Sequence, residues 1–232
     1  ADCGYPLGHL PATQPHTLLS FTHQQRLSTL TWYEDAPWNG LCSTPNLDRL
    51  REQSVLFSNA YSSCPLCSPA RASVMTGMFP IGHGVTDNVD TFNSNVMELP
   101  DCDHLLSRKL GSAGYRCGYS GKWHLGTNRT QRYFYDSKPS YPESVGFEGH
   151  QFPGHGGGGF YSPEYHEYQA RFGHEPGCVL RTEHRLTPGQ VPRFGVLEHD
   201  EVEATVPYYL AENTISLIKR FKSETPEQPF FI

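Results

Sequence analysis

Short apolar runs at wide intervals along this chain predict its strands. Residues 16–22 (HTLLSFT) form a continuous apolar run, which predicts a buried strand, and residues 55–61 (VLFSNAY) alternate between apolar and polar positions. Residues 115–120 (YRCGYS) and the apolar run at 229–232 (PFFI) predict two further strands. Because these segments are far apart in the sequence, other elements must connect them.

The intervals between the apolar runs carry the spacing of amphipathic helices. One helix is expected after Thr44, where a capping residue precedes a proline at the first helical position, with Leu47 and Leu50 on one buried face. A second helix is expected over 101–110, where the glycines that follow can end it. A third is expected over 205–222. Strands alternating with helices predict an α/β fold, with a mostly parallel sheet that helices cover on both sides.

Residues 127–200 do not follow this alternation. They are rich in Gly, Pro, His and Tyr and show weak periodicity. A long irregular segment inside a compact domain is usually functional, so we expect a loop-rich substrate segment here. The chain stops inside the last apolar run, and a domain seldom ends one residue into a core strand. We therefore expect residues 1–232 to be the N-terminal part of a single domain.

Composition and charge narrow the classes of protein. The 232 residues are 37% hydrophobic, which is enough for a core, and 22 Gly with 19 Pro predict many loops. The net charge of −6 argues against a nucleic-acid partner, and no apolar run approaches the length that spans a membrane. The seven cysteines are odd in number and scattered, so they are interpreted mainly as free or buried thiols. The compartment stays open.

The stretch SSCPLCSPARASVMTG at 62–77 raises the question of what Cys67 does. Pro69 suits the first position of a helix that a terminal glycine ends, so Cys67 is expected just before the helix N-terminus, where backbone amides and the helix dipole favour an anion. Arg71 would add a fixed positive charge near that end, as suits a nucleophile facing a sulfate or phosphate ester. A structural cysteine, or a redox pair or half a zinc site formed with Cys64, are the alternatives.

A second stretch, GYRCGYSGKWHLG at 114–126, carries Lys122 and His124 in a glycine-bounded loop after a predicted strand. Sites in open parallel sheets lie at the carboxyl ends of strands. An ammonium and an imidazole two residues apart can hold an anionic ester and move a proton. Taken alone, the pair is better interpreted as two polar surface residues.

Together the two stretches closely resemble the type I sulfatases of the alkaline-phosphatase superfamily. CSPARASVMTG matches the first signature of that family and GYRCGYSGKWH matches the second, in the family's order. TPNLDRL, FSNAY and PIGHGV also look familial. The similarity is dense over residues 15–126 and looser over 205–232. It implies that residues 1–232 are the N-terminal part of a single sulfatase-like catalytic domain.

The resemblance implies a sulfuric-ester hydrolase that cleaves a small-molecule or carbohydrate sulfate ester. A formylglycine-generating maturation enzyme would oxidise Cys67 to formylglycine, whose hydrate is the nucleophile and a metal ligand. Arg71 would hold the formylglycine, Lys122 would contact the sulfate, and His124 would orient the formylglycine hydroxyl or assist its deprotonation. A divalent metal, calcium before others, would polarise the sulfate oxygens.

One run departs from the family pattern. Where the family has T-D-D-x-R or T-D-Q-Q-R, residues 22–26 read THQQR, so that the metal ligands would be Cys67, Gln24 and His23. Calcium prefers oxygen donors, whereas imidazole suits zinc and other transition metals. Two alternatives stay open. One is a phosphonate monoester or phosphodiester hydrolase with the same nucleophile, because the anion site does not distinguish sulfur from phosphorus. The other, suggested by His23, is a non-catalytic sulfatase-like binding protein. The other histidines, His83 and His104 included, are expected to be solvated or to belong to the substrate segment.

Overall fold

The computed structural model describes residues 14–23, 25–33, 43–89, 93–126, 140–149, 163–173, 180–181, 196–197 and 202–232. The chain divides into two compact units. The large unit comprises Ala1–Leu18 and Ser63–Ile232, and the small unit comprises Leu19–Ser62. Both signature stretches lie in the large unit, and the THQQR run lies in the small unit.

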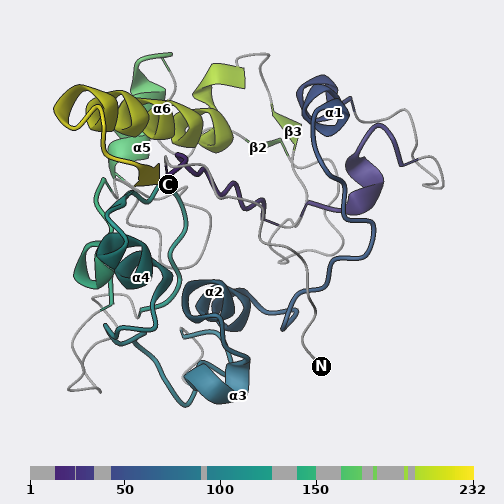
Figure 1. Ribbon diagram of the computed structural model, residues 1–232. Helices are drawn as coiled ribbons and strands as arrows, with labels where there is room; N and C mark the ends of the chain where they lie inside the picture. The colour runs from purple at the N-terminus through teal and green to yellow at the C-terminus, as the bar shows by residue number, and fades with distance from the viewer. Residues whose placement is uncertain are drawn as a thin grey trace. The chain divides into compact units, whose positions relative to one another are not determined.

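The elements of the two units are labelled in Figure 1. The helices of the large unit are α2 (Cys67–Thr76), α3 (Pro80–His83), α4 (Leu106–Ser112), α5 (Pro163–Ala170) and α6 (Val206–Glu224). Its strands are β1 (Arg116–Cys117), β2 (Leu180–Arg181), β3 (Val196–Leu197) and β4 (Phe230–Phe231). Its described residues also form the 3-10 turns η3 (Glu143–Val145) and η4 (Val202–Ala204). The small unit holds η1 (Leu27–Thr29) and α1 (Pro45–Glu52).

A parallel ladder lies at the centre of the large unit. β1 pairs with β4 in parallel, with Cys117 opposite Phe231, as expected for strands joined by a long connection. Thr17 extends the ladder by a parallel bridge to Phe231, and Glu148 extends it by a parallel bridge to Gly118. β2 and β3 form a separate antiparallel pair. The prediction of parallel strands is therefore confirmed, although the strands are shorter than expected.

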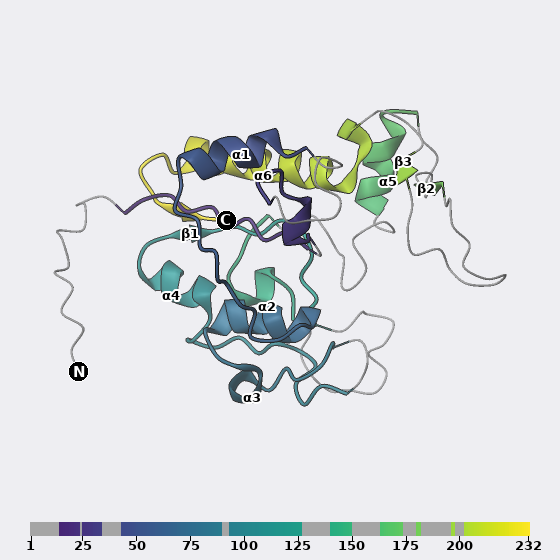
Figure 2. The ribbon, with the colours of Figure 1, turned by 90° about the vertical axis from the view of Figure 1, so that its right-hand side faces the viewer.

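Helices lie on both sides of the β1–β4 pair. In Figures 1 and 2, α6 lies on one side of it and α2 and α4 lie on the other. Successive residues of β4 explain this arrangement, because side chains alternate between the faces of a strand. Phe230 packs with Leu217 and Phe221 of α6, whereas Phe231 packs in the cluster that contains Met75 of α2. The predicted two-sided covering of the sheet is confirmed.

An ionic cluster fixes β1 against α6. The guanidinium of Arg116 donates to both carboxylate oxygens of Glu148 and to Glu224 at 2.6 Å, and it lies 4.1 Å from the ring centre of Phe221. Arg220 donates to Glu148 at 3.1 Å. The hydrogen bond from Arg116, chiefly, holds the pKa of Glu148 below its usual value. This cluster helps to hold the strand whose carboxyl end leads into the second signature.

Two of the predicted strands do not form as expected. Only Thr17 of residues 16–22 pairs with another segment, and the apolar side chains of this run are exposed instead of buried. Residues 55–61 form no strand, and Val55 and Phe57 are 80% and 76% exposed. Alternation favours a strand only where another segment supplies the backbone hydrogen bonds, and no described segment pairs with 55–61.

The predicted helices form, with three corrections. α1 begins after Thr44 as expected, but Leu50 is 60% exposed and does not belong to a buried face. α4 begins only at Leu106, because its N-cap Leu105 has an extended backbone. α6 confirms the third helix, and α5 shows that the segment predicted to be irregular contains a helix. No helix among the described residues combines the length and apolarity needed to cross a membrane.

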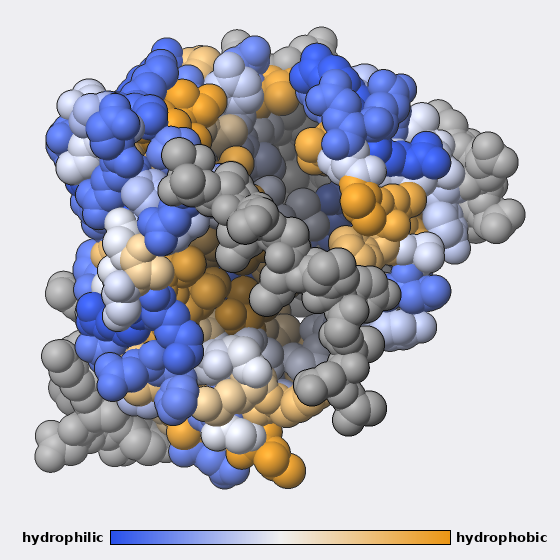
Figure 3. Space-filling view, in the orientation of Figure 1, coloured by the Kyte–Doolittle hydropathy of each residue, from blue (hydrophilic) through white to orange (hydrophobic). Residues whose placement is uncertain are grey.

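Around α3, apolar side chains are exposed to solvent. Ile81 is 95% exposed, and Phe79 at the N-cap of this helix is mostly exposed too. Figure 3 shows hydrophobic surface at the lower edge of the molecule, where Figure 1 places α3. The last residue of α3, His83, contacts Ser73 of α2 through its imidazole and so anchors this helix.

Candidate active site

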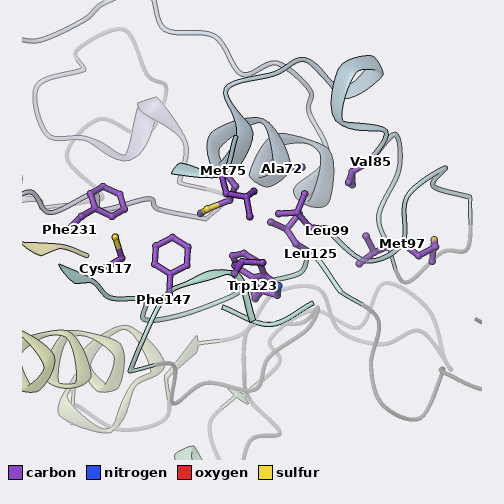
Figure 4. Close-up of a cluster of buried hydrophobic side chains, with 13 residues drawn as sticks. Ala72, Met75, Val85, Met97, Leu99, Cys117, Trp123, Leu125, Phe147 and Phe231 are labelled. Atoms are coloured by element: carbon purple, nitrogen blue, oxygen red, sulfur yellow. The ribbon is translucent and has the colours of Figure 1, made fainter. Parts of the chain in front are cut away.

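A hydrophobic cluster anchors the helix that begins at Cys67. Ala72 and Met75 lie on one face of α2 and are buried with Leu99, Leu125 and Trp123 (Figure 4). Trp123 belongs to the second signature and Leu125 directly follows it, so the two signatures share this core. Burial of apolar side chains is the main force that fixes one element on another. The position of Cys67 is thereby tied to that of the Lys122–His124 loop.

Cys67 is the first residue of α2, and not the residue before it as predicted. The N-cap is Leu66, whose carbonyl accepts a hydrogen bond from the amide of Ala70 at 3.2 Å. Pro69 is the third helical residue, where its missing N–H is no more costly than at the first, because none of the first four amides has a partner inside the helix. The predicted end is confirmed, since Gly77 caps α2 in the left-handed conformation with φ 70°.

The amides at this helix start are less available to an anion than predicted. The amide of Ser68 donates to Oδ1 of Asn88 at 3.1 Å, and Oγ of Ser68 accepts from the amide of Val89 at 3.3 Å. Pro69 has no amide hydrogen. Two of the first three positions of α2 therefore cannot donate to a bound ester. Positive side chains must supply most of the attraction for an anion here.

Arg71 joins the two signatures directly. Its Nη1 donates to the carbonyl oxygen of Lys122 at 2.5 Å, across 51 positions of sequence. The hydroxyl of Tyr119 donates to the same carbonyl at 2.6 Å and accepts from Arg71 at 3.4 Å. The structure thus brings Arg71 and the Lys122 backbone together. Sequence reasoning missed Tyr119, since nothing local to it signals a contact with α2.

The loop with Lys122 and His124 follows the carboxyl end of β1, as predicted for a site in a parallel sheet. Lys122 is half-buried and His124 is 3% exposed. His124 has φ 54°, a left-handed conformation that is costly for a residue with a Cβ. The flanking residues impose it: Nε1 of Trp123 donates to Ser140 at 3.2 Å, and the carbonyl of Leu125 accepts from Leu99 at 2.8 Å. Strain of this kind is concentrated at functional sites.

His83 is not solvated, contrary to the prediction. Its Nδ1 accepts from the amide of Val85 at 3.1 Å, and its Nε2 lies 3.1 Å from Oγ of Ser73 on α2. Burial lowers the pKa of His83, offset in part by a backbone hydrogen bond with Pro69. In the neutral ring the proton is therefore on Nε2, where it is donated to Ser73. His83 consequently cannot act as a base toward Ser73, and this pair is not a nucleophile with its base.

The remaining histidine and cysteine predictions have mixed outcomes. His104 is exposed, as expected, and the side chains of the histidines between 150 and 200 lie outside the described residues. The four described cysteines are free thiols, so Cys64 and Cys67 form no disulfide. Burial, with a smaller contribution from Glu148, raises the pKa of Cys117 to about 11. Cys117 is accordingly an inert buried thiol.

The proposed metal ligands are divided between the two units. His23 is exposed in the small unit, Gln24 lies outside the described residues, and Cys67 is in the large unit. Within the described ranges no three His, Cys, Asp or Glu side chains gather in a way that could hold a metal ion. The ligand set implied by the resemblance stays a prediction.

Comparison with known proteins identifies the family. The sulfatase family model matches residues 12–232, so this chain belongs to the sulfatase family. The chain is 45% identical over 89 residues to human N-acetylgalactosamine-6-sulfatase, covering 36% of this chain and 17% of that protein. It is 31% identical over 125 residues to N-acetylglucosamine-6-O-sulfatase of Bacteroides thetaiotaomicron, covering 54% of this chain and 20% of that protein.

A solved structure has a similar fold. A solved structure titled "Crystal structure of Ps i-CgsB" matches with a TM-score of 0.56 at 22% identity, covering 94% of this chain and 44% of that one. This likeness concerns the fold alone. The α/β class, with a parallel sheet between helices, is therefore confirmed. The matched segments span about a fifth of the length of the two curated relatives.

Proposed function

We propose that the protein containing this chain hydrolyses sulfate monoesters. The observation that carries this proposal is the contact between Arg71 and the Lys122 carbonyl, which holds two cationic residues close to one another at the carboxyl end of β1. A sulfate ester carries its negative charge on an oxygen-rich head. A fixed guanidinium and a nearby ammonium suit such a head, and charge-assisted hydrogen bonds to it are about twice as strong as neutral ones.

Each residue has a separate role in the proposed reaction. Formylglycine at position 67 would supply a geminal diol, of which one hydroxyl attacks sulfur and displaces the alcohol of the ester. Deprotonation of the other hydroxyl then expels sulfate and restores the aldehyde, which water rehydrates. Arg71 holds residue 67 and balances charge beside it. Lys122 binds a sulfate oxygen, and the buried His124 orients the attacking hydroxyl or accepts its proton. Because Cys67 opens α2, the helix dipole also favours negative charge at this position.

A divalent metal belongs to the proposal, although its identity is a separate question. A cation would polarise the sulfate oxygens, with Cys67 as formylglycine, Gln24 and His23 among its ligands. An amide oxygen suits calcium, the ion we propose from the family resemblance, whereas the imidazole of His23 suits zinc better. Elemental analysis of the purified whole protein, with titration of each metal into protein freed of metal, measures which ion it binds.

The substrate class is proposed from the relatives. Their names specify N-acetylgalactosamine-6-sulfatase, N-acetylglucosamine-6-O-sulfatase and ulvan-active sulfatase activities. We infer a carbohydrate sulfate as substrate, with the segment at 127–200 as the source of specificity, because loops on a rigid scaffold usually carry it. We also propose that residues 1–232 are the N-terminal part of one catalytic domain.

Relative rates on matched esters test the proposal. The whole protein, made in a host that carries the formylglycine-generating enzyme, is assayed on sugar and aryl sulfates and on the corresponding phosphodiesters and phosphonate esters. Release of sulfate at the higher kcat/KM supports the proposal. A strong preference for phosphorus would overturn it in favour of a phosphodiester or phosphonate hydrolase. Binding of sulfated sugars without turnover would instead indicate a non-catalytic protein, the alternative that His23 suggests.

A further inference from the structure

Tyr119 belongs to the second signature and contacts Arg71 of the first, but it is not among the residues assigned a role above. It follows β1 by two positions and is partly buried against the main hydrophobic cluster. Its ring meets the Trp123 ring edge-on, with centroids 5.3 Å apart at 89°, and the Phe147 ring at 5.4 Å and 62°. Two aromatic neighbours on different segments leave the Tyr119 ring little freedom to rotate.

The hydroxyl of this fixed ring is aimed at the site. It donates to the Lys122 carbonyl at 2.6 Å, which is the shorter side of the ordinary range, and it accepts from Nη1 of Arg71 at 3.4 Å. The Lys122 carbonyl therefore has two donors, one from α2 and one from Tyr119. Together the three groups form a closed triangle of contacts.

This triangle constrains the two cationic residues in different ways. The carbonyl of Lys122 belongs to the planar peptide group between Lys122 and Trp123, so two donors on that oxygen fix the plane from which the Lys122 backbone departs. Arg71 is fixed because its Nη1 donates hydrogen bonds both to the Lys122 carbonyl oxygen and to the Tyr119 hydroxyl. Errors of about 1 Å in the position of such groups can cost about 10²-fold in rate.

The hydroxyl is also suited to remain a donor. Burial raises the pKa of Tyr119, and the charge and hydrogen bond of Arg71 oppose this only in part. The phenol therefore keeps its proton at neutral pH and above. A phenolate could not donate to the Lys122 carbonyl, which would then have Arg71 as its only donor in the triangle.

We propose that Tyr119 is a positioning residue for sulfate binding, whose hydroxyl aligns Arg71 and Lys122 on the ester. This inference rests on the proposed sulfatase function and extends it to a residue outside both cationic positions. The Tyr119 hydroxyl acts through Arg71 and the Lys122 backbone, and it does not itself touch the substrate. The Tyr119 ring packs against the loop that carries Lys122, and the Tyr119 hydroxyl fixes the position of that loop relative to Arg71 of α2.

Two substitutions separate the hydroxyl from the ring. Tyr119→Phe removes only the hydroxyl, and Tyr119→Leu removes the ring as well. Tyr115→Phe is the matched control, because Tyr115 packs against the same cluster and its hydroxyl has no hydrogen bond to the part of the chain that the structure describes. For each form of the whole protein, kcat and KM on a sulfate ester, the inhibition constant of inorganic sulfate and the Tm are measured.

We expect Tyr119→Phe to lower kcat/KM by about five- to tenfold and to weaken inhibition by sulfate by a similar factor, at a Tm close to that of the wild type. Tyr115→Phe leaves both constants unchanged, and Tyr119→Leu adds a fall in Tm. The proposal is overturned if Tyr119→Phe keeps both constants within about twofold, or if its losses only follow a fall in Tm that Tyr119→Leu deepens. A wild type that releases no sulfate overturns the proposed function itself, and this inference with it.

Discussion

The guanidinium of Arg71 donates to the backbone carbonyl of Lys122, and not to its side chain. A backbone contact of this kind survives any substitution at position 122 that leaves the loop in place. The ammonium of Lys122 is thus separable from the interaction that joins the two signatures. This separation allows the chemistry of the site and its architecture to be tested by different variants.

Removal of the Lys122 side chain tests the chemistry. We expect Lys122→Ala to lower kcat/KM on a sulfate ester by about 10²-fold or more, because the ester loses the ammonium proposed to bind a sulfate oxygen. The Tm should change little, since the carbonyl still accepts from Arg71 and Tyr119. Lys109→Ala, at an exposed position of α4, is the control for loss of a lysine. Turnover near the wild-type level in Lys122→Ala would remove Lys122 from the mechanism.

Substitution of Arg71 tests the architecture as well as the chemistry. Arg71→Ala removes one of the two donors to the Lys122 carbonyl, so we expect the free energy of unfolding to fall by about 1–2 kcal/mol along with turnover. Arg71→Lys keeps the charge but lacks the planar fork, and it should restore only part of either property. Urea unfolding measures the stability. An Arg71→Ala protein as stable as the wild type would mean that this contact does not hold the signatures together.

The close approach at Gly126, two residues after the second signature, gives a stability prediction for the loop that carries Lys122 and His124. A Cβ at this position would lie 2.4 Å from the Ser140 carbonyl and 2.5 Å from Oε2 of Glu98, so Gly126→Ala should destabilise the fold by about 1–3 kcal/mol. Gly111→Ala in α4 is the matched control: its Cβ would meet no atom within 4 Å, and alanine should stabilise the helix by about 0.5–1 kcal/mol. Thermal unfolding of both variants checks the contrast, which equal shifts in Tm would contradict.

Some features of the fold and the site could be predicted from the sequence, and others could not. The end of α2 at Gly77 and the course of α6 follow from local signals, a left-handed glycine and a helical spacing of apolar residues. The absence of a strand at 55–61 was not readable, because pairing depends on a partner elsewhere in the chain. The same holds for the amide of Ser68, which Asn88 engages from 20 positions away. The resemblance identified Arg71 and Lys122, but no local signal in the sequence predicts the contact between the Arg71 guanidinium and the Lys122 carbonyl.

Titration of His83 gives a pH prediction. Burial lowers its pKa in the folded state, so the unfolded chain binds the proton more tightly than the folded one. The stabilisation is complete above the unfolded pKa of 6.5 and is lost as the pH falls below it, toward the lower pKa of the folded state. The free energy of unfolding should therefore decrease between about pH 7.5 and about pH 5. His83→Gln should make that decrease smaller.

His104→Gln provides the control for this titration, because His104 is exposed. A change that His104→Gln reproduces would be a general effect of replacing a histidine. Glu148, whose pKa is also lowered, loses its contribution only at lower pH, since its unfolded pKa is 4.5. A His83→Gln protein with the same pH dependence as the wild type would show that His83 does not titrate with unfolding in this range.

The central claim is that Cys67, at the first position of α2, becomes the nucleophile for a sulfate ester held by Arg71 and Lys122. Mass spectrometry of the peptide that contains residue 67 tests it most directly, on whole protein from a host with the formylglycine-generating enzyme. The account predicts an aldehyde at this position. An intact thiol there would contradict it.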